Sequence, residues 1–289
     1  MPIALLADRA LISVSGAEAE HFLQNILTTD LDALAEGQAK PGALLTPQGK
    51  ILFDFLISRA GEQGFRIECR LDVIDDFIKR LTLYRLRAKA EISKPDQSFV
   101  SVSWQDDSPA SHFDSPSAVV RDARFADEPV FRIYGGKPAG QEDAAAWHAF
   151  RIGHGIAESG ADYALGDAFP HDVLLDQTGG VGFKKGCYVG QEVVSRMQHR
   201  GTARRRVLLA SAETALPPPG TDISAGGRAL GTLGSVSAAS GLAIVRIDRV
   251  KDALDAGTEI LADGIALKLA IPAWAAFTFP QNSAGAENA

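Results

Sequence analysis

The segment GFKKGCYVGQE, residues 182–192, holds one of only two cysteines among 289 residues. Cys187 follows two lysines and lies between Gly186 and Gly190. The glycines let the backbone turn sharply or approach a ligand closely, because they carry no Cβ atom. A thiol in such a turn is a nucleophile, a docking point for a metal or a partner, or a small core residue.

The residues that follow, EVVSRMQHR, predict a short helix whose N-terminus lies near Cys187. This helix end and the neighbouring Lys184 and Lys185 favour thiolate over thiol, so we expect the pKa of Cys187 to lie below the free value of about 8.5. A buried cysteine held between two turns agrees equally well with the residue types. Two distant cysteines cannot supply the four thiolates of a stable iron–sulfur cluster, so any cluster contact would be transient or shared with a partner.

Arg196 and Arg200 are four residues apart and share one face of this predicted helix. Such a pair suits bidentate contacts with a carboxylate or a phosphate, although solvated surface side chains explain the same spacing. The segment 184–206 contains seven basic residues and one acid, whereas the whole chain has a net charge of −7. The acidic balance argues against a broad nucleic-acid binding surface, and the basic zone is either a localised anion site or a solvated face.

The elements around this segment predict an α+β protein, because helices and strands mix without regular alternation. Ser15-Gly-Ala-Glu18 matches a capping box and predicts a helix over 16–28. Further helices are predicted near 73–81 and 141–153. Strands are predicted at 50–58, 65–70, 99–104, 118–125, 130–135, 206–212, 228–238, 241–248, 258–262 and 265–271.

Turn signals and apolar patterns refine this outline. Pro47–Gly49 predicts a turn before the first of these strands, and Asp263-Gly264 predicts a hairpin between the last two. The strands after residue 206 indicate a small β-barrel or sandwich. Cys69 shares one strand face with Phe65 and Ile67, which is typical of a core residue.

Composition places the chain among ordinary globular proteins. Its length predicts two or three domains, and its apolar runs are too short to span a membrane. The N-terminus lacks the basic region of a signal peptide, and two cysteines are too few for a secreted disulfide scaffold. These features predict a cytoplasmic protein without a membrane partner. The last residues, 281–289, are predicted to be a disordered tail.

A family resemblance adds to this reading. Lys185-Gly-Cys-Tyr-Val-Gly-Gln-Glu192, followed by Arg196 and Arg200-Gly201, resembles the KGCYxGQE signature of the YgfZ family. These are folate-binding proteins implicated in iron–sulfur cluster assembly and repair, and they form a branch of the aminomethyltransferase (glycine-cleavage T-protein) superfamily. Weaker similarities to the family lie at 22–24, 28–30, 45–50, 151–156, 169–170 and 175–177.

The resemblance implies a three-lobed, T-protein-like ring. Residues 1–200 would form two α+β lobes that bind folate, with the second lobe, roughly 48–138, inserted in the first. Residues 201–280 would form a C-terminal β-barrel. Tetrahydrofolate or a derivative would lie in the central channel, and the resemblance implies no permanently bound metal.

The resemblance also implies roles for individual residues. Cys187 would be the thiol on which cluster work depends, with iron–sulfur assembly proteins as partners. Asp172 falls where related proteins carry a glutamate that grips the pterin, and a carboxylate suits the paired N–H donors of a pterin edge. Asp is shorter by one C–C bond, so the contact is direct or through a water. The remaining residues expected at the folate or in the motif are Lys185, Gly186, Tyr188, Gly190, Gln191, Glu192, Arg196 and Arg200.

Two other functions stay open. Asp54 falls where the T-protein has an acidic pair, but Phe53 replaces one partner, which weakens the case for an aminomethyl transferase. Asp54 alternatively makes only a hydrogen bond at a sheet edge. The third possibility is a non-catalytic scaffold linked to tRNA modification. Among the three, an accessory protein for cluster assembly agrees best with the cysteine motif.

Overall fold

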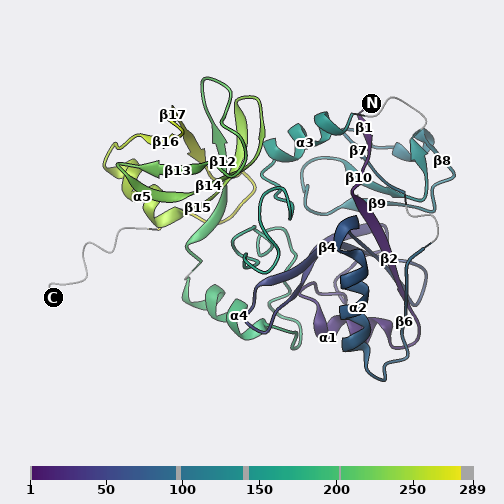
Figure 1. Ribbon diagram of the computed structural model, residues 1–289. Helices are drawn as coiled ribbons and strands as arrows, with labels where there is room; N and C mark the ends of the chain where they lie inside the picture. The colour runs from purple at the N-terminus through teal and green to yellow at the C-terminus, as the bar shows by residue number, and fades with distance from the viewer. Residues whose placement is uncertain (1, 96–98, 139–142, 202, 281–289) are drawn as a thin grey trace. The chain divides into compact units, whose positions relative to one another are not determined.

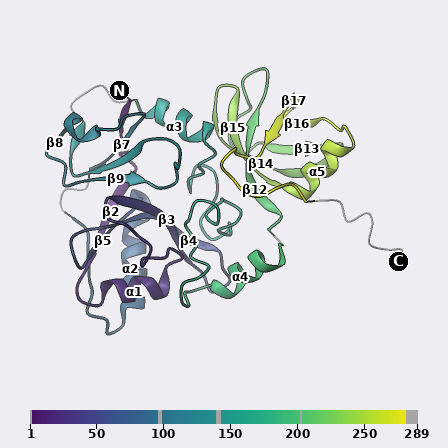
Figure 2. The same cartoon turned by 180° about the vertical axis from the view of Figure 1, so that it is seen from behind.

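The computed structural model describes residues 2–95, 99–138, 143–201 and 203–280 (Figures 1 and 2). The chain divides into two compact units. The first unit is Met1–Phe150, Ala164–Pro170 and Leu175–Gly201, and the second is Arg151–Tyr163, His171–Leu174 and Thr202–Ala289. The predicted tail, 281–289, lies outside the described residues, and the domain boundaries predicted from the sequence stay predictions.

The described part of the first unit contains a nine-stranded sheet in the order β1-β7-β10-β9-β3-β4-β5-β2-β6. The neighbours are antiparallel except β3 and β9, which pair in parallel through Gln38 and Arg121. The strands are β1 (Ile3–Leu5), β2 (Arg9–Ser15), β3 (Gln38–Leu45), β4 (Ile51–Arg59), β5 (Gly64–Arg70), β6 (Glu91–Ser93), β7 (Val100–Trp104), β9 (Ala118–Asp122) and β10 (Val130–Tyr134). A separate pair joins β8 (Phe113–Asp114) to β11 (Lys137–Pro138).

Helices α1 (Ala19–Ile26) and α2 (Ile74–Arg85) pack against the strands β2, β4 and β5 (Figures 1 and 2). Their shared core forms because apolar residues recur at helical spacing in the helices and at every second position in the strands. Phe53 of β4 stacks on Phe77 of α2, with ring centroids 4.6 Å apart. Cys69 lies in the same core with 0% exposure, which confirms its prediction as a core residue.

The predicted first helix exists, but its capping box does not. Ser15 is the last residue of β2 and pairs with Gly64, so it cannot adopt the N-cap position. The helix begins at Ala19, with Glu18 as N-cap and no side-chain cap. The Glu18 carboxylate instead accepts a hydrogen bond from the Lys89 N–H. A pairing with a distant strand therefore overrides a local sequence signal.

The other helices agree with their patterns. The predicted helix near 73–81 is α2, preceded by the 3₁₀ turn η1 (Leu71–Val73). The helix predicted near 141–153 is α3 (Ala144–Gly153), and residues 141–142 of that prediction lie outside the described residues. The segment after the cysteine turn forms α4 (Gln191–Arg200), as predicted. A second 3₁₀ turn, η2 (Pro109–His112), precedes β8.

The second unit contains a small β-barrel, as predicted. Its strand order is β17-β16-β13-β14-β15-β12-β18. The strands are β12 (Arg205–Ser211), β13 (Asp222–Ala225), β14 (Arg228–Ser237), β15 (Ser240–Arg246), β16 (Ile260–Ala262), β17 (Ile265–Ala266) and β18 (Lys268–Ala270). Asp263 and Gly264 both have positive φ and form the predicted hairpin turn between β16 and β17. The mixture of helices and sheets confirms the α+β class.

Helix α5 (Ile247–Asp255) was not predicted, because the strand pattern was extended to residue 248. Its buried residues Ile247, Val250 and Ala253 are spaced by three, which is a helical period. Among the described residues, none of the helices combines the length and the apolar character needed to cross a bilayer.

Candidate functional site

Cys187 lies in an irregular segment of the first unit, three residues before the N-cap of α4, and its side chain is exposed. The other cysteine is unavailable, because burial in the core raises the pKa of the Cys69 thiol to about 12. Cys187 is therefore the one accessible thiol in the described part of the chain. This excludes the reading of Cys187 as a buried core residue.

The cysteine segment is anchored to the loop after α1. Lys185 Nζ donates hydrogen bonds to the carbonyl oxygens of Leu27 and Thr29, at 2.7 and 2.8 Å. Burial lowers the pKa of Lys185 to about 8, although the nearby carboxylates of Asp30 and Asp32 act in the opposite direction. The sequence analysis assigned Lys185 to folate and to the thiolate, whereas the structure gives its ammonium group two carbonyl partners.

A second anchor joins the same segments. Thr28 Oγ1 donates to the carbonyl oxygen of Gly180 at 2.7 Å, and the Gly182 N–H donates to the Thr28 carbonyl oxygen at 2.8 Å. Sequence reasoning noted the Thr28-Thr29-Asp30 segment only as a family similarity. In the structure, the hydrogen bonds of Thr28 fix residues 180–182, which precede the cysteine turn.

Tyr188 is buried, with 7% exposure, and burial raises the pKa of its phenol to about 12. Its ring lies beneath the Lys185 ammonium group, 5.4 Å from Nζ to the ring centroid. The expected contact of Tyr188 with folate stays a prediction.

Two glycines bring the β3–β4 turn against the start of α4. A Cβ atom on Gly190, which has φ +78°, would lie 2.5 Å from the Thr46 carbonyl oxygen. A Cβ atom on Gly49 would lie 2.9 Å from the Val193 side chain. By contrast, a Cβ atom on Gly186 would meet nothing within 4 Å. Gly190 is therefore required for close packing, whereas Gly186 is not.

The two arginines of α4 face solvent. The side chain of Arg196 is 54% exposed and forms an ion pair with Glu192 one turn earlier. Arg200 is exposed at the last position of the helix, next to the C-cap Gly201. Arg196 and Arg200 share one face of α4, as predicted, but the guanidinium of Arg196 is already paired with the carboxylate of Glu192. A buried two-arginine clamp for an anion is therefore not formed within this helix.

Asp172 belongs to the second unit, whereas Cys187, Arg196 and Arg200 belong to the first. It is buried, with 2% exposure, and its carboxylate lies 3.8 Å from Arg205 Nε at the start of β12. The neighbouring His171 carbonyl oxygen accepts a hydrogen bond from the Arg206 guanidinium at 2.9 Å. The expectation that Asp172 and the two arginines all contact folate stays a prediction.

Asp54 lies in β4 and is half-buried on the strand face opposite Phe53. Its strand is paired on both sides, with β3 and with β5, and Asp54 itself lies opposite Ala43. The pairing with β5 covers Leu56–Arg59 and does not reach Asp54, so the alternative of a hydrogen bond at a sheet edge stays a prediction. Phe53, in the place of the second acid, packs in the helix-covered core.

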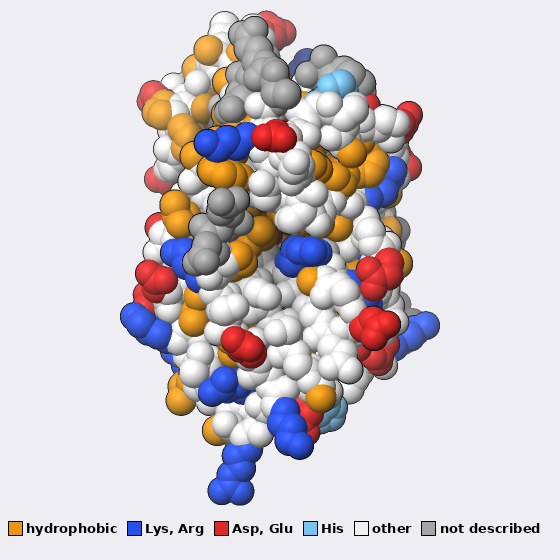
Figure 3. All heavy atoms as spheres, turned by 90° about the vertical axis from the view of Figure 1, so that its right-hand side faces the viewer, with side chains coloured by type: hydrophobic (Ala, Val, Ile, Leu, Met, Phe, Trp, Pro, Cys, Tyr) orange, Lys and Arg blue, Asp and Glu red, His pale blue; other side chains and the backbone are white. Residues whose placement is uncertain are grey.

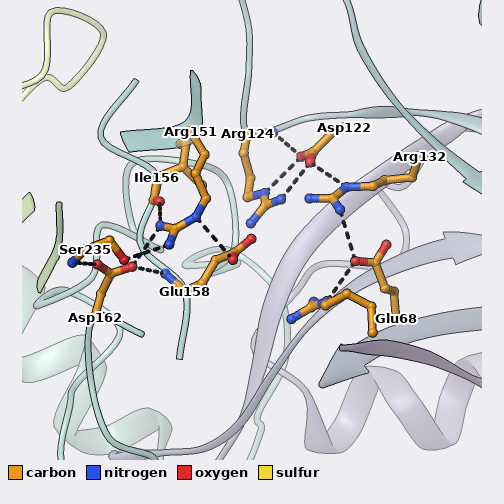
Figure 4. A network of polar contacts seen from close by, with 10 residues as sticks. Glu68, Asp122, Arg124, Arg132, Arg151, Ile156, Glu158, Asp162 and Ser235 are labelled. Carbon is orange, nitrogen blue, oxygen red and sulfur yellow. Dashed lines mark hydrogen bonds and ion pairs between the residues drawn. The ribbon is translucent and has the colours of Figure 1, made fainter. Parts of the chain in front are cut away.

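Sequence reasoning missed a buried ionic network in the first unit (Figure 4). Arg132 Nη1 lies 3.4 Å from Glu68 Oε1, and Arg132 Nε lies 3.1 Å from Asp122 Oδ2. Arg124 pairs with the same Asp122 carboxylate at 2.7 Å. Burial by itself would raise the pKa of Asp122, but the two arginines outweigh it and lower this pKa to about 2. Glu68 is 64 residues from Arg132, so no local sequence signal indicates their pairing.

The second unit has a comparable centre on Arg151 (Figure 4). Its guanidinium lies 2.9 Å from Asp162 Oδ2 and 3.3 Å from Glu158 Oε2, and it donates to Ser235 Oγ at 2.7 Å. These contacts attach residues 151–163 to strand β14 of the barrel. The predicted similarity at 151–156 therefore falls on a structural anchor.

In the described residues, His, Cys, Asp and Glu side chains form no group of three or more that could hold a metal ion. Cys187 can therefore offer a cluster one thiolate, and any remaining ligands must come from another molecule.

The sequence of this chain is similar to that of several known proteins. Residues 204–277 match the model of the CAF17 C-terminal beta-barrel domain. The iron–sulfur cluster assembly factor IBA57 homolog of Chaetomium globosum, a mitochondrial protein by name, is 33% identical over 71% of this chain and 55% of its own length. Mouse IBA57 is 28% identical over 93% of this chain and 84% of its own length. This chain is similar to iron–sulfur cluster assembly factors.

The fold comparison agrees with the sequence prediction. The glycine cleavage system aminomethyltransferase T of Bartonella henselae superposes with a TM-score of 0.74 over 94% of this chain and 86% of its own, at 17% sequence identity. The chain therefore has the T-protein-like fold with a C-terminal β-barrel, as predicted. The chain spans about half the length of the first curated relatives that it matches.

One prediction is overturned. The sequence analysis predicted a cytoplasmic protein, whereas the IBA57 relatives are named as mitochondrial. The prediction rested on few cysteines and no signal peptide, and these features do not distinguish the cytoplasm from other reducing compartments.

Proposed function

We propose that this protein is an accessory factor of iron–sulfur cluster assembly or repair, of the YgfZ type, and that Cys187 is its working thiol. The supporting observation is the exposed thiol on a segment anchored by Lys185 and by Gly190. The similarity to IBA57 proteins supports the class of function. The cluster is cargo here, so the chain needs no permanent metal site of its own.

The chemistry available to Cys187 is ligation. Its S–H loses a proton to solvent, and the resulting thiolate donates an electron pair to a cluster iron. Since Cys69 is buried, the other iron ligands come from a partner chain or a small thiol. A partner that brings a partly ligated cluster to the exposed turn is therefore the iron–sulfur assembly protein that this proposal requires.

The test is cellular and direct. In cells that depend on this chain, Cys187→Ser should lower the activity of an iron–sulfur enzyme such as aconitase, while the amount of soluble protein stays unchanged. Phe183→Ser, which alters a neighbouring exposed residue of the same segment, is the matched control. Full enzyme activity in the Cys187→Ser cells would contradict the proposal.

We further propose that the protein binds a reduced folate, with Asp172 as the group that accepts hydrogen bonds from the pterin. Asp172 fits this role because a carboxylate suits the paired N–H donors of a pterin edge, and this carboxylate is buried beside the Arg205 guanidinium. Arg196 fits less well, because Glu192 already neutralises it. The proposed contact of Arg200, an exposed residue of the first unit, with folate rests on the family resemblance alone.

Calorimetry with a reduced folate tests this second proposal. Asp172→Asn keeps the shape but replaces one accepting oxygen by a donor, so we expect an affinity loss of about tenfold or more. Arg200→Ala should weaken binding less, because its group is exposed. Asp252→Asn in an exposed ion pair is the control. If the parent protein binds no folate, the folate proposal is wrong, and the proposal for Cys187 is unaffected.

The transferase alternative gains no support from the site. Phe53 takes the place of the second acid and packs in the core, so Asp54 has no acidic neighbour from the adjacent position. General acid–base chemistry on an amine donor needs a second proton-transfer group. Catalytic turnover is therefore not part of the proposal.

A further inference from the structure

The end of α2 displays two leucines to solvent. Leu83 is 63% exposed and Leu86 is 84% exposed. Ile74, Phe77 and Leu81 of this helix are buried in the core, and Ile78 is partly buried against it. We call residues 83–89, LYRLRAK, the leucine tip. Such high exposures mean that the two side chains project from the surface and do not line a groove.

The backbone at the tip is strained by its sequence. Leu86 is the C-cap of α2 and has φ 49° and ψ −105°. Glycine or asparagine is usual where a helix ends with positive φ, because a Cβ atom is unfavourable there. Leucine at this position therefore gains neither backbone relief nor burial. Leu86 therefore costs stability through its backbone conformation and its exposure, which suggests that it serves binding to another molecule.

The tip is also strongly basic. Between Phe77 and Ala90 the chain carries five Lys or Arg residues and no acid, although the whole protein has a net charge of −7. Arg87 and Lys89 are exposed, and neither side chain forms an ion pair within the part of the chain that the structure describes. Figure 3 shows Lys and Arg side chains at the lower end of the molecule, with hydrophobic, acidic and histidine side chains among them.

Neighbouring charges reduce this excess but do not reverse it. Lys79 is paired with Asp76 at 3.1 Å, and Lys94 lies 4.0 Å from Asp75 at the other end of the helix. Glu18 accepts the backbone N–H of Lys89, and its charge therefore lies close to the tip. Glu91, two residues after Lys89, is a further exposed acid, but within the described residues neither Arg87 nor Lys89 forms an ion pair.

We propose that the leucine tip docks this protein reversibly on an anionic lipid surface. Exposed leucines enter the headgroup boundary while neighbouring Lys and Arg residues meet lipid phosphates. An acidic protein partner is favoured less, because a stable protein interface needs about 800 Å² per partner around an apolar centre, and two isolated leucines do not supply it. The absence of a membrane span does not bear on surface docking. The proposal is independent of the cysteine function.

Vesicle flotation with the full chain tests the proposal. We expect the protein to float with vesicles of phosphatidylcholine and phosphatidylglycerol, and not with phosphatidylcholine alone. Binding should weaken as salt rises, because the electrostatic part is screened within a Debye length of about 10 Å at 0.1 M salt. Failure to float with the anionic vesicles at low salt overturns the lipid proposal and leaves an acidic protein as the replacement.

Substitutions separate docking from folding. Leu83→Ser combined with Leu86→Ser should lower the partition coefficient about tenfold, and Arg87→Glu combined with Lys89→Glu should do the same. Leu86→Gly should lower it while leaving the melting temperature unchanged or higher, because glycine relieves the strained φ. Leu254→Ser, at a leucine of the second unit that is 49% exposed, is the control. Equal flotation of the tip variants and the parent, or an equal loss in the control, overturns the assignment of the tip.

Discussion

Lys185 Nζ lies 2.8 Å from the carbonyl oxygen of Thr29, although 156 residues separate the two in sequence. The same nitrogen donates to the Leu27 carbonyl oxygen at 2.7 Å. These bonds fix the chain two residues before the exposed thiol of Cys187. The lysine of the motif therefore acts on the loop that carries the cysteine.

Lys185→Met should loosen this segment. Methionine matches the apolar stem of lysine but lacks the ammonium group, so two partly buried carbonyl oxygens lose their donor, which costs about 1–3 kcal/mol in the free energy of unfolding. Urea unfolding measures the loss, and the alkylation rate of Cys187 by iodoacetamide measures the loosening. Lys184→Met changes the exposed neighbour and should alter neither. Equal stability of the two variants would refute the anchor.

The pH dependence of stability carries a signature of Lys185. Its folded pKa of about 8 lies below the unfolded value of 10.5, so the folded state binds fewer protons between these values. This group therefore makes stability rise with pH between about 8 and 10.5. The difference in unfolding free energy between the parent and Lys185→Met, followed across this window, should show that slope. A flat difference would contradict the lowered pKa.

The two thiols should differ sharply in reactivity. An aromatic disulfide reagent should titrate one thiol of the native protein quickly and the second only in denaturant, because Cys69 is fully buried and its pKa is raised to about 12. In Cys187→Ser the fast phase should disappear, whereas in Cys69→Ala it should remain. Two fast thiols in the native parent would show that the core around Cys69 opens readily.

The two glycines beside Cys187 should respond differently to substitution. Gly190→Ala places a Cβ atom 2.5 Å from the Thr46 carbonyl oxygen at a residue with φ +78°, so we expect a loss of about 1–3 kcal/mol in stability. Gly186→Ala meets no atom within 4 Å and should be close to neutral. Thermal unfolding compares the two. Similar melting temperatures would mean that the β3–β4 turn moves away from α4 at little cost.

The buried network should resist acid. The carboxylate of Asp122 has a folded pKa of about 2, below its unfolded value of 3.8. Its stabilising contribution is therefore complete above pH 3.8 and is lost as the pH falls toward 2. Asp122→Asn leaves Arg124 and Arg132 without that charge and should cost about 3–5 kcal/mol.

An exposed ion pair provides the matched comparison for this variant. Asp252→Asn breaks the pair with Arg228, whose side chains are 51% and 56% exposed, and should cost at most about 1 kcal/mol. Acid titrations of both variants, followed by circular dichroism, give the two values. A loss for Asp122→Asn no larger than that for Asp252→Asn would show that the network is not needed for stability.

Local patterns in the sequence determined several features correctly. The turn at 47–49, the hairpin at Asp263-Gly264 and the helix after the cysteine depend on residues within a few positions of one another, so their chemistry can be read in place. Cys69 was placed in the core because alternation along a strand reports which residues share a face. The capping box at Ser15 failed because the pairing of Ser15 with Gly64 across β2 and β5 removed the cap residue from the helix.

The sequence by itself determined the α+β class, the C-terminal barrel and a cysteine turn with the residue types of a reactive site. Only the tertiary structure decided that Lys185 anchors to Thr29, and that Glu68, Arg132 and Asp122 share a buried network. The physical reason is range. Periodicity and turn chemistry act within a few residues, whereas the partner of a charged side chain depends on which distant segments burial brings together and on which charge must be neutralised there.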